Sequence, residues 1–460
     1  MRTPYNPPVA ASFHFERSIP FSPENSAETL RAIPALPGVF ALHGPRSEDE
    51  PYLTRAADLR RRITRILAPP DSQSKRLNLR TRVARIDFSI TGSEFESALT
   101  LYHASADLFG LAEARRRLRL HTPFFLRFTA ENAYPRVYST NRLSRRALAH
   151  SYGPFPSRAA ADRYCDAILD LFKLRRCYED LAPYPKHPGC VYGEMNKCLA
   201  PCNQACTPAG AAAYAAEAAA VEAFFASHGE SLLAQLTADR EQASANLNFE
   251  RAAQLHAHLL RVKAAAALAD PLVQPIPRLC AVIVQKAVAE SRNPDPVILS
   301  EARSAESKDL RFAGLDTEAG PTAALFLVEA GSLVGPARLA PAGPTDSAAA
   351  SDSADAPAPS PEERATHILA DLAARARPHT KSAPDLTTLS DHLSLLRRWY
   401  YRPEKQRTGE VFFPKEDTPD TTAWPIRRIL NAAARISLGE PKPIAEPQHQ
   451  PLQSPIEPGG

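Results

Sequence analysis

The chain of 460 residues lacks any run of 18 or more apolar residues, so its sequence predicts no membrane-spanning helix and no membrane partner. Its opening residues, MRTPYNPP, lack the apolar stretch of a signal peptide, which favours a cytoplasmic location. The chain also lacks a large net charge. Its formal net charge is only +4, which does not by itself indicate a nucleic-acid partner. With 44 % hydrophobic and 23 % charged residues, the chain has the composition of a globular protein that can bury a sizeable core.

Cysteine is scarce, but its seven copies are unevenly placed, and five of them fall between Cys177 and Cys206. Disulfides are rare in cytosolic proteins, so thiols grouped in this way indicate a metal site. Four thiolates from one loop can close a tetrahedral shell around Zn²⁺ or hold a 4Fe–4S cluster. Four buried structural cysteines are the alternative interpretation.

The hydrophobic pattern predicts an α/β fold with several domains. Residues 82–90 alternate polar and apolar side chains as a half-buried strand does, and Ser93 with Glu96 forms the capping signature of a following helix. An alanine-rich stretch at 208–268 is strongly helical. The predicted regions are a leader (1–33), an α/β domain (34–126), a cysteine-bearing segment (127–207), a helical region (208–268), an unassigned α+β region (269–340), a linker (341–385), a helical and strand region (386–440) and a disordered tail (441–460).

Arginine and lysine residues cluster in three places, at 55–65, 75–85 and 115–119. Such a density of cations favours phosphate contacts, which position DNA without reading its sequence. For any single residue, a solvated helix face is the alternative. The residues that we expect to contact DNA are Arg55, Arg60, Arg61 and Arg65.

Three separated motifs occur in a fixed order. Pro37–Phe40 (PGVF) is followed by Tyr52–Ile63 (YLTRAADLRRRI), then by Tyr152–Ser157 (YGPFPS), and later by Leu247–Ala253 (LNFERAA). Together they resemble the N-terminal half of the UvrC family of excinuclease subunits. That resemblance covers residues 34–263 and implies a small GIY-YIG-type mixed domain, a cysteine-rich segment and a UVR helical hairpin, with an unassigned α+β domain after them.

In this family the GIY-YIG site cleaves a phosphodiester with one Mg²⁺ or Mn²⁺ held by a glutamate, while tyrosines and an arginine position the water and the phosphate. Tyr52 and Arg62 match the second tyrosine and the arginine. Phe40 replaces the first tyrosine, and Leu101 stands where the resemblance places the glutamate, although an apolar side chain cannot bind a metal. The resemblance therefore implies either a chain that binds DNA without incising it, or an active structure-specific endonuclease that uses a non-standard carboxylate for Mg²⁺ or Mn²⁺.

Two nearby carboxylates are candidates for that replacement. Glu94 lies seven residues before Leu101, which is two helical turns and about 10 Å, too far to supply the missing ligand. Charges at a helix N-terminus, favoured by the helix dipole, are the better interpretation of Glu94 and Glu96.

The other two motifs imply a cofactor and a partner. The resemblance assigns an iron–sulfur cluster, or zinc as the alternative, to Cys177, Cys190, Cys198 and Cys202. A UVR hairpin at residues 232–263 implies docking on UvrB in nucleotide excision repair, with packing against the chain's own domains as the alternative. The residues expected to bind this partner are Leu247, Phe249, Glu250 and Ala253.

Overall fold

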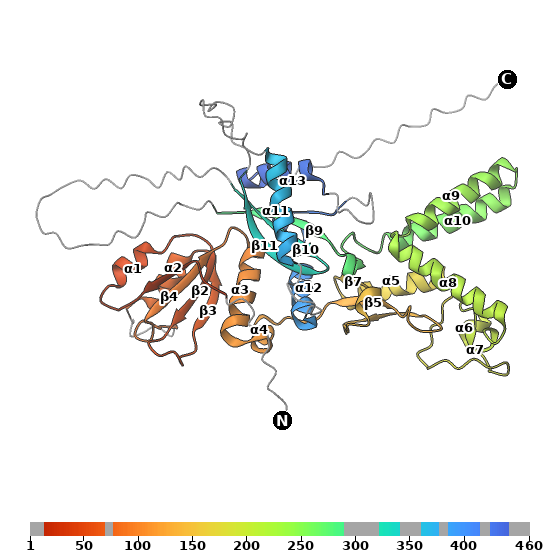
Figure 1. Ribbon diagram of the computed structural model, residues 1–460, viewed down its shortest axis with the longest axis horizontal. Helices are drawn as coiled ribbons and strands as arrows, with labels where there is room; N and C mark the ends of the chain where they lie inside the picture. The colour runs from red at the N-terminus through yellow and green to blue at the C-terminus, as the bar shows by residue number, and fades with distance from the viewer. Residues whose placement is uncertain are drawn as a thin grey trace, which may run out of the picture.

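The computed structural model describes residues 13–69, 77–288, 322–340, 360–376, 385–414 and 424–440. It confirms a mixed α/β protein, in which the described strands form three antiparallel sheets (Figure 1). Within these ranges, every helix is too short or too polar to cross a bilayer. The predicted tail at 441–460 lies outside the described residues.

The first sheet has four strands, β1 (Arg17–Pro20), β2 (Gly38–His43), β3 (Tyr52–Ala56) and β4 (Arg85–Ile90). Their order is β1-β4-β2-β3, and the core beneath them is formed with helices α1 (Ser26–Ala32) and α2 (Leu59–Leu67). Asp58 begins α2 by accepting a hydrogen bond from the backbone of Arg61. The prediction of a separate leader at 1–33 was wrong for its described part, because β1 pairs with β4 and adds a strand to this sheet.

The second sheet has the order β6-β5-β7-β8 and is formed by β5 (Phe124–Phe128), β6 (Val137–Thr140), β7 (Ser151–Phe155) and β8 (Gln274–Pro275). Because β5 belongs to this sheet, the predicted end of the first domain at residue 126 was a few residues too late. Its core is shared with helices α5 (Arg158–Leu171), α8 (Pro208–Ala226), α9 (Glu230–Ala245) and α10 (Phe249–Ala266). Two short helices, α6 (Val191–Glu194) and α7 (Pro201–Gln204), lie in the cysteine-bearing segment.

The third sheet joins two regions that the sequence predicted separately. Its order is β11-β10-β9-β12, with β9 (Ala281–Lys286), β10 (Ala323–Glu329), β11 (Ser332–Leu339) and β12 (Glu410–Phe412). Side chains of β9 alternate between two cores, since Ile283 lies in one and Val282 and Val284 lie in the other. Because both faces of the sheet are buried, successive residues of β9 are apolar instead of alternating with polar ones.

Helices cover both faces of the third sheet. Helices α11 (Pro361–Ala376) and α13 (Ile426–Leu438) pack on one face, and α12 (Leu386–Tyr400) packs on the other. The prediction that 341–385 is a linker was wrong for α11, because Ala365, Leu369 and Leu372 form an apolar stripe that is buried against the sheet.

Helix α3 (Glu94–Phe109) joins the N-terminal and C-terminal parts of the chain (Figure 1). The Ser93 hydroxyl accepts a hydrogen bond from the Glu96 backbone at 3.1 Å, so the predicted cap is present. Its apolar side chains pack mainly on α12 and the third sheet, and the Phe95 ring lies 5.1 Å from the rings of both Phe326 and Trp399. Helix α4 (Leu111–Leu118) follows, and Arg115 forms an ion pair with Asp391 at 2.9 Å.

The substitution Phe95→Ala tests this packing. Because Phe95 is only 3 % exposed between two aromatic rings, we expect the free energy of unfolding to fall by about 3–5 kcal/mol in urea denaturation. The control Leu260→Ala removes a side chain that is 52 % exposed and should change the free energy by less than about 0.5 kcal/mol. Equal small effects of the two substitutions would contradict the assignment of Phe95 to the core.

Candidate functional site

The residues expected at the nuclease site are only partly brought together. The Arg62 guanidinium donates to the Tyr52 hydroxyl at 3.4 Å, so these two matching residues are neighbours. Phe40 is fully buried, with its ring centroid 6.3 Å from that of Tyr52. It is part of the hydrophobic core beneath the first sheet, and it has no hydroxyl to offer a substrate.

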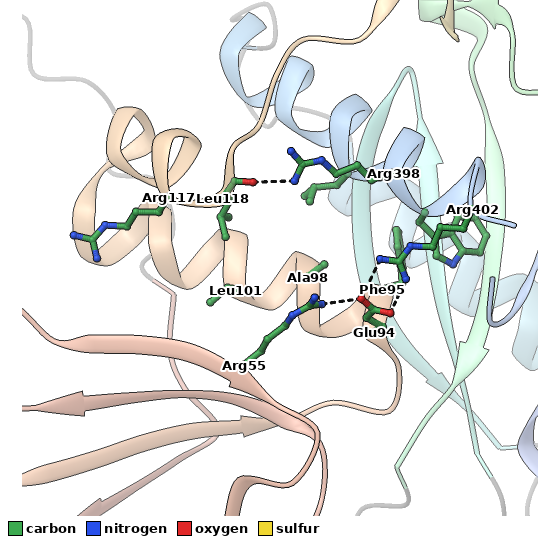
Figure 2. Close-up of a pocket in the computed structure, with 11 residues that line it drawn as sticks. Arg55, Glu94, Phe95, Ala98, Leu101, Arg117, Leu118, Arg398 and Arg402 are labelled. Carbon is green, nitrogen blue, oxygen red and sulfur yellow. Dashed lines mark hydrogen bonds and ion pairs between the residues drawn. The ribbon is translucent and has the colours of Figure 1, made fainter. Parts of the chain in front are cut away.

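Leu101 lines a different hollow from Arg62. It is half-buried on α3 at the edge of a cleft of about 290 Å³ between the N-terminal domain and α12 (Figure 2). Arg62 and Arg65 instead line a separate hollow of about 240 Å³ with Ile66 and Leu77. The position expected to bind the metal and the position expected to bind the phosphate therefore do not share one pocket.

The two candidate carboxylates, Glu94 and Glu96, are both bound by arginines. Figure 2 shows Arg55 and Arg402 reaching Glu94 from opposite sides, with Arg402 at 2.5 and 3.0 Å and Arg55 at 3.2 Å. Hydrogen bonds from Arg402 are the main cause that holds the pKa of Glu94 below its usual value. Glu94 is therefore ionised and forms a bridge between β3 and the end of α12.

Glu96 has a more buried environment. Its carboxylate is 3 % exposed, accepts a hydrogen bond from the Gly92 backbone at 2.8 Å and pairs with Arg338 at 2.8 Å. Burial raises the pKa of Glu96, and the positive charge of Arg338 opposes this shift. Both glutamates lie in the first turn of α3, as the sequence indicated, and each has a structural role that leaves it poorly placed to bind a metal at Leu101.

The cleft also contains Arg117, from the predicted basic cluster at 115–119, and two arginines that the sequence analysis missed, Arg398 and Arg402. Arg398 donates to the Leu118 carbonyl at 2.8 Å, and Arg117 pairs with Glu113 at 2.7 Å while its guanidinium lies 3.9 Å from the Phe109 ring centroid. Arg398 lies in α12 and Arg402 lies two residues after its end, about 300 residues along the chain from Glu94, so no local pattern could associate them. The Arg398 contact holds α12 against the end of α4, and the Arg402 contact holds the segment after α12 against α3.

The four arginines expected to contact DNA differ in whether their side chains already bind other groups of the protein. Arg55 is bound to Glu94, and Arg60 donates to the backbone carbonyls of Ile33 and Arg31 at 2.6 and 3.2 Å. Arg61 and Arg65 are exposed on α2, and neither side chain has a hydrogen-bond or ion-pair partner within the described ranges. Of the four, these two are the better placed for phosphate.

The four cysteines expected at the metal site lie in one segment beside α8. Cys198 and Cys202 are each 6 % exposed, whereas Cys177 and Cys190 are half-buried and Cys206 is exposed. Burial, together with the nearby thiols of Cys190, Cys177 and Cys202, raises the pKa of the Cys198 thiol to about 11. The four thiols therefore lie close enough for their charges to affect one another.

The arrangement of these thiols is looser than a closed ligand shell. Among the residues that the structure describes, no three His, Cys, Asp or Glu side chains are arranged to hold a metal ion. The donor set nevertheless suits a soft metal, because it consists of thiols alone and because a cation would remove the repulsion between neighbouring thiolates. Pro201 occupies the first turn of α7, where proline lacks only an N–H that needs no helical partner.

The hairpin of α9 and α10 has a buried base and an exposed tip. At the base, Leu236, Leu255 and Leu259 pack into the core of the second sheet. At the tip, Leu247 is 73 % exposed and Phe249 is 66 % exposed. Glu250 and Ala253 are also accessible, so all four residues expected to bind a partner can be reached from solvent.

The turn of this hairpin is held by a cap at the start of α10. Asn248 caps α10 by accepting a hydrogen bond from the Arg251 backbone at 3.1 Å. Leu247 adopts a positive φ of 57°, a backbone conformation that a leucine seldom adopts. This conformation places an exposed apolar side chain at the end of the hairpin, which projects away from the three sheets (Figure 1).

Comparisons with known proteins identify the central part of the chain. Residues 124–224 match the family model of the UvrC/Cho excinuclease middle domain, and residues 230–265 match that of the UvrB/uvrC motif. No solved structure is significantly similar to the chain.

Curated relatives agree with these matches. The UvrABC system protein C of Aliivibrio salmonicida is 28 % identical over 233 residues, which are 51 % of this chain and 37 % of that protein. Its counterpart from Desulforudis audaxviator is 28 % identical over 240 residues, 52 % of this chain and 37 % of that protein. The matched stretch thus spans little more than a third of the relatives' length. The middle-domain match, the UVR-motif match and these relatives together support a relationship between the matched half of the chain and the UvrC family.

Proposed function

We propose that this chain acts in nucleotide excision repair as a UvrC-like protein that binds DNA and docks on UvrB, without incision by its N-terminal domain. The exposed tip of the α9–α10 hairpin carries the proposal. Leu247 and Phe249 are large apolar side chains held in water by a hairpin whose own core is complete without them. Exposed apolar side chains grouped on a rigid element are typical of partner-binding sites.

Absence of incision is proposed from the state of the N-terminal domain. Leu101 and Phe40 lack the oxygen atoms that the family's chemistry uses, and Glu94 and Glu96 are each bound to arginine. A hard cation such as Mg²⁺ requires oxygen ligands, and carboxylates that already neutralise arginines are poor candidates for that role. The alternative of an endonuclease with a non-standard carboxylate therefore has less support than a binding protein.

Metal binding is proposed for the segment between Cys177 and Cys202. Cys177, Cys190, Cys198 and Cys202 would hold a 4Fe–4S cluster, or zinc, since each offers one sulfur ligand. A bound cluster or ion would cross-link the segment and so stabilise its position beside α8. Arg175, whose guanidinium lies 4.0 Å from the Cys177 sulfur, would help to compensate the negative charge of the thiolates.

Docking through the hairpin tip predicts the outcome of Phe249→Ala. Because Phe249 is 66 % exposed, its loss should change the free energy of unfolding by less than about 0.5 kcal/mol. If the ring is an anchor at the interface, the variant should bind UvrB roughly tenfold or more weakly than the wild type does. A pull-down should then recover less UvrB with the variant. Leu260→Ala, on α10 but away from the tip, is the matched control, and equal recovery of UvrB by both variants would contradict docking at the tip.

The cysteine segment predicts an iron content. Protein purified without oxygen should be brown and contain about four irons per chain, as a 4Fe–4S cluster requires. Cys198→Ser should lose the colour and the iron, whereas Cys206→Ser, which changes the exposed spare thiol, should keep both. Stoichiometric zinc without iron would exclude the cluster but keep the site, and absence of both metals would exclude the site.

The N-terminal domain is expected not to nick DNA. Removal of one electrostatic contact to a transition state costs roughly 10²–10³ in rate, and a missing metal ligand should cost at least as much. Supercoiled plasmid incubated with the full chain and Mg²⁺ or Mn²⁺ should remain intact. Metal-dependent nicking that disappears in Arg62→Ala but persists in Arg31→Ala, which changes an exposed arginine on α1, would show that the Tyr52–Arg62 site is active after all.

A further inference from the structure

A third hollow lies on the second sheet, away from both the N-terminal domain and the hairpin tip. It has a volume of about 490 Å³ and is formed by β5, β6 and the loop that follows β6. The residues that line it are predominantly polar and basic: Arg127, Glu131, Tyr138, Thr140, Arg142, Leu143, Ser144, Arg146 and Ala147.

The floor of this hollow is a fixed cation. Arg127 is 4 % exposed and forms an ion pair with Glu131. It also donates to the backbone carbonyls of Phe128 and His150, the latter at 3.4 Å. These contacts hold the Arg127 guanidinium in place, and the Glu131 carboxylate neutralises its charge.

The rim of the hollow carries three further arginines. Arg142, Arg145 and Arg146 are exposed on the loop after β6. In the described part of the chain, none of these three side chains has a hydrogen-bond or ion-pair partner. Arg142 and Arg146 line the hollow itself, and Glu131 is the only carboxylate among the residues that line it. The excess positive charge therefore faces a concave surface that suits a polyanion.

An aromatic stack continues from this hollow toward the cysteine segment. The Arg136 guanidinium lies 4.8 Å from the ring centroid of Tyr138 and 4.6 Å from that of Tyr178. Arg136 also donates to the Cys177 carbonyl at 3.3 Å, which fixes the stack against the cysteine segment. Tyr178 is 74 % exposed, so much of its surface is open to a ligand.

We infer that Arg142, Arg146 and Tyr178 form a binding site for single-stranded DNA. Basic side chains along a groove combined with exposed aromatic rings are the features by which proteins hold single strands, since the cations follow the phosphates and the rings stack on bases. The hollow has room for one unstacked nucleotide, whereas the bases of a duplex are paired and not free to stack on Tyr178. The inference rests on the proposed DNA binding and adds the strand type and the residues that contact it.

Fluorescence anisotropy of the full chain with a labelled 20-nucleotide single strand tests the arginines. We expect Arg142→Ala combined with Arg146→Ala to weaken binding about tenfold or more. The dependence of log K on log salt should become shallower by roughly 0.7 for each phosphate that the protein no longer neutralises. The double variant Arg375→Ala with Arg427→Ala removes the same charge from exposed positions on α11 and α13 and should bind as the wild type does.

Tyr178→Ala tests the stacking surface in the same assay. We expect at least about a fivefold loss for the single strand, the lower end of the effect of removing a base–aromatic stack, and a smaller loss for a duplex of the same sequence. Tyr184→Ala, which removes another exposed tyrosine of this segment, should have no effect.

Three results would overturn the inference. Unchanged single-strand binding by the arginine pair or by Tyr178→Ala would exclude this site while leaving DNA binding intact. An equal loss in the control arginine pair would indicate a general effect of net charge. If the wild type binds neither strand form, both this site and the proposed DNA binding fail, whereas UvrB docking is tested separately and can still hold.

Discussion

Burial of α3 against the C-terminal domain is the constraint on which the arrangement of this protein depends. The Tyr102 hydroxyl lies 3.2 Å from Asp391, and Arg115 pairs with the same carboxylate, which is 1 % exposed. Burial raises the pKa of Asp391, and the positive charge of Arg115 opposes that shift. Because a buried charge without its partner is costly, these contacts fix α3 and α4 on α12.

This position of α3 explains the state of the N-terminal site. Its apolar stripe is used to bury Phe95, Leu99 and Tyr102 in the C-terminal core. Its remaining face presents Glu94 and Leu101 to a cleft in which Arg55 of β3 and Arg402, just after α12, bind Glu94 (Figure 2). The helix that carries the metal ligand in the UvrC pattern thus serves here as an inter-domain joint. The residues proposed to bind a metal, single-stranded DNA and UvrB lie on the middle domain and the hairpin.

Local signals in the sequence predicted local structure well. The cap at Ser93, the glutamates in the first turn of α3 and the helices within 208–268 are all present, because each depends on residues within a few turns. The accessibility of Leu247 and Phe249 also agrees with their predicted role, although partner binding itself stays a prediction.

The pairing of strands that lie far apart in the chain could not be predicted from the sequence. Gln285 donates to the Thr408 carbonyl 123 residues away, and nothing local in the chain indicates that β9 and β12 are neighbours. Helix α11 was missed because its stripe of Ala365, Leu369 and Leu372 follows a stretch rich in proline, alanine and serine. The hollow rimmed by Arg142 and Arg146 was missed because one short arginine-containing loop does not stand out in an arginine-rich chain, and only the fold places it over Arg127.

The central claim, docking on the repair complex without cutting, is tested most directly on a lesion-bearing duplex loaded with UvrA and UvrB in the presence of Mg²⁺. The account predicts that adding this chain produces a slower-migrating complex on a native gel, while both DNA strands remain uncut on a denaturing gel. Cleavage of either strand that requires this chain, or failure of the chain to join the UvrB–DNA complex, would contradict it.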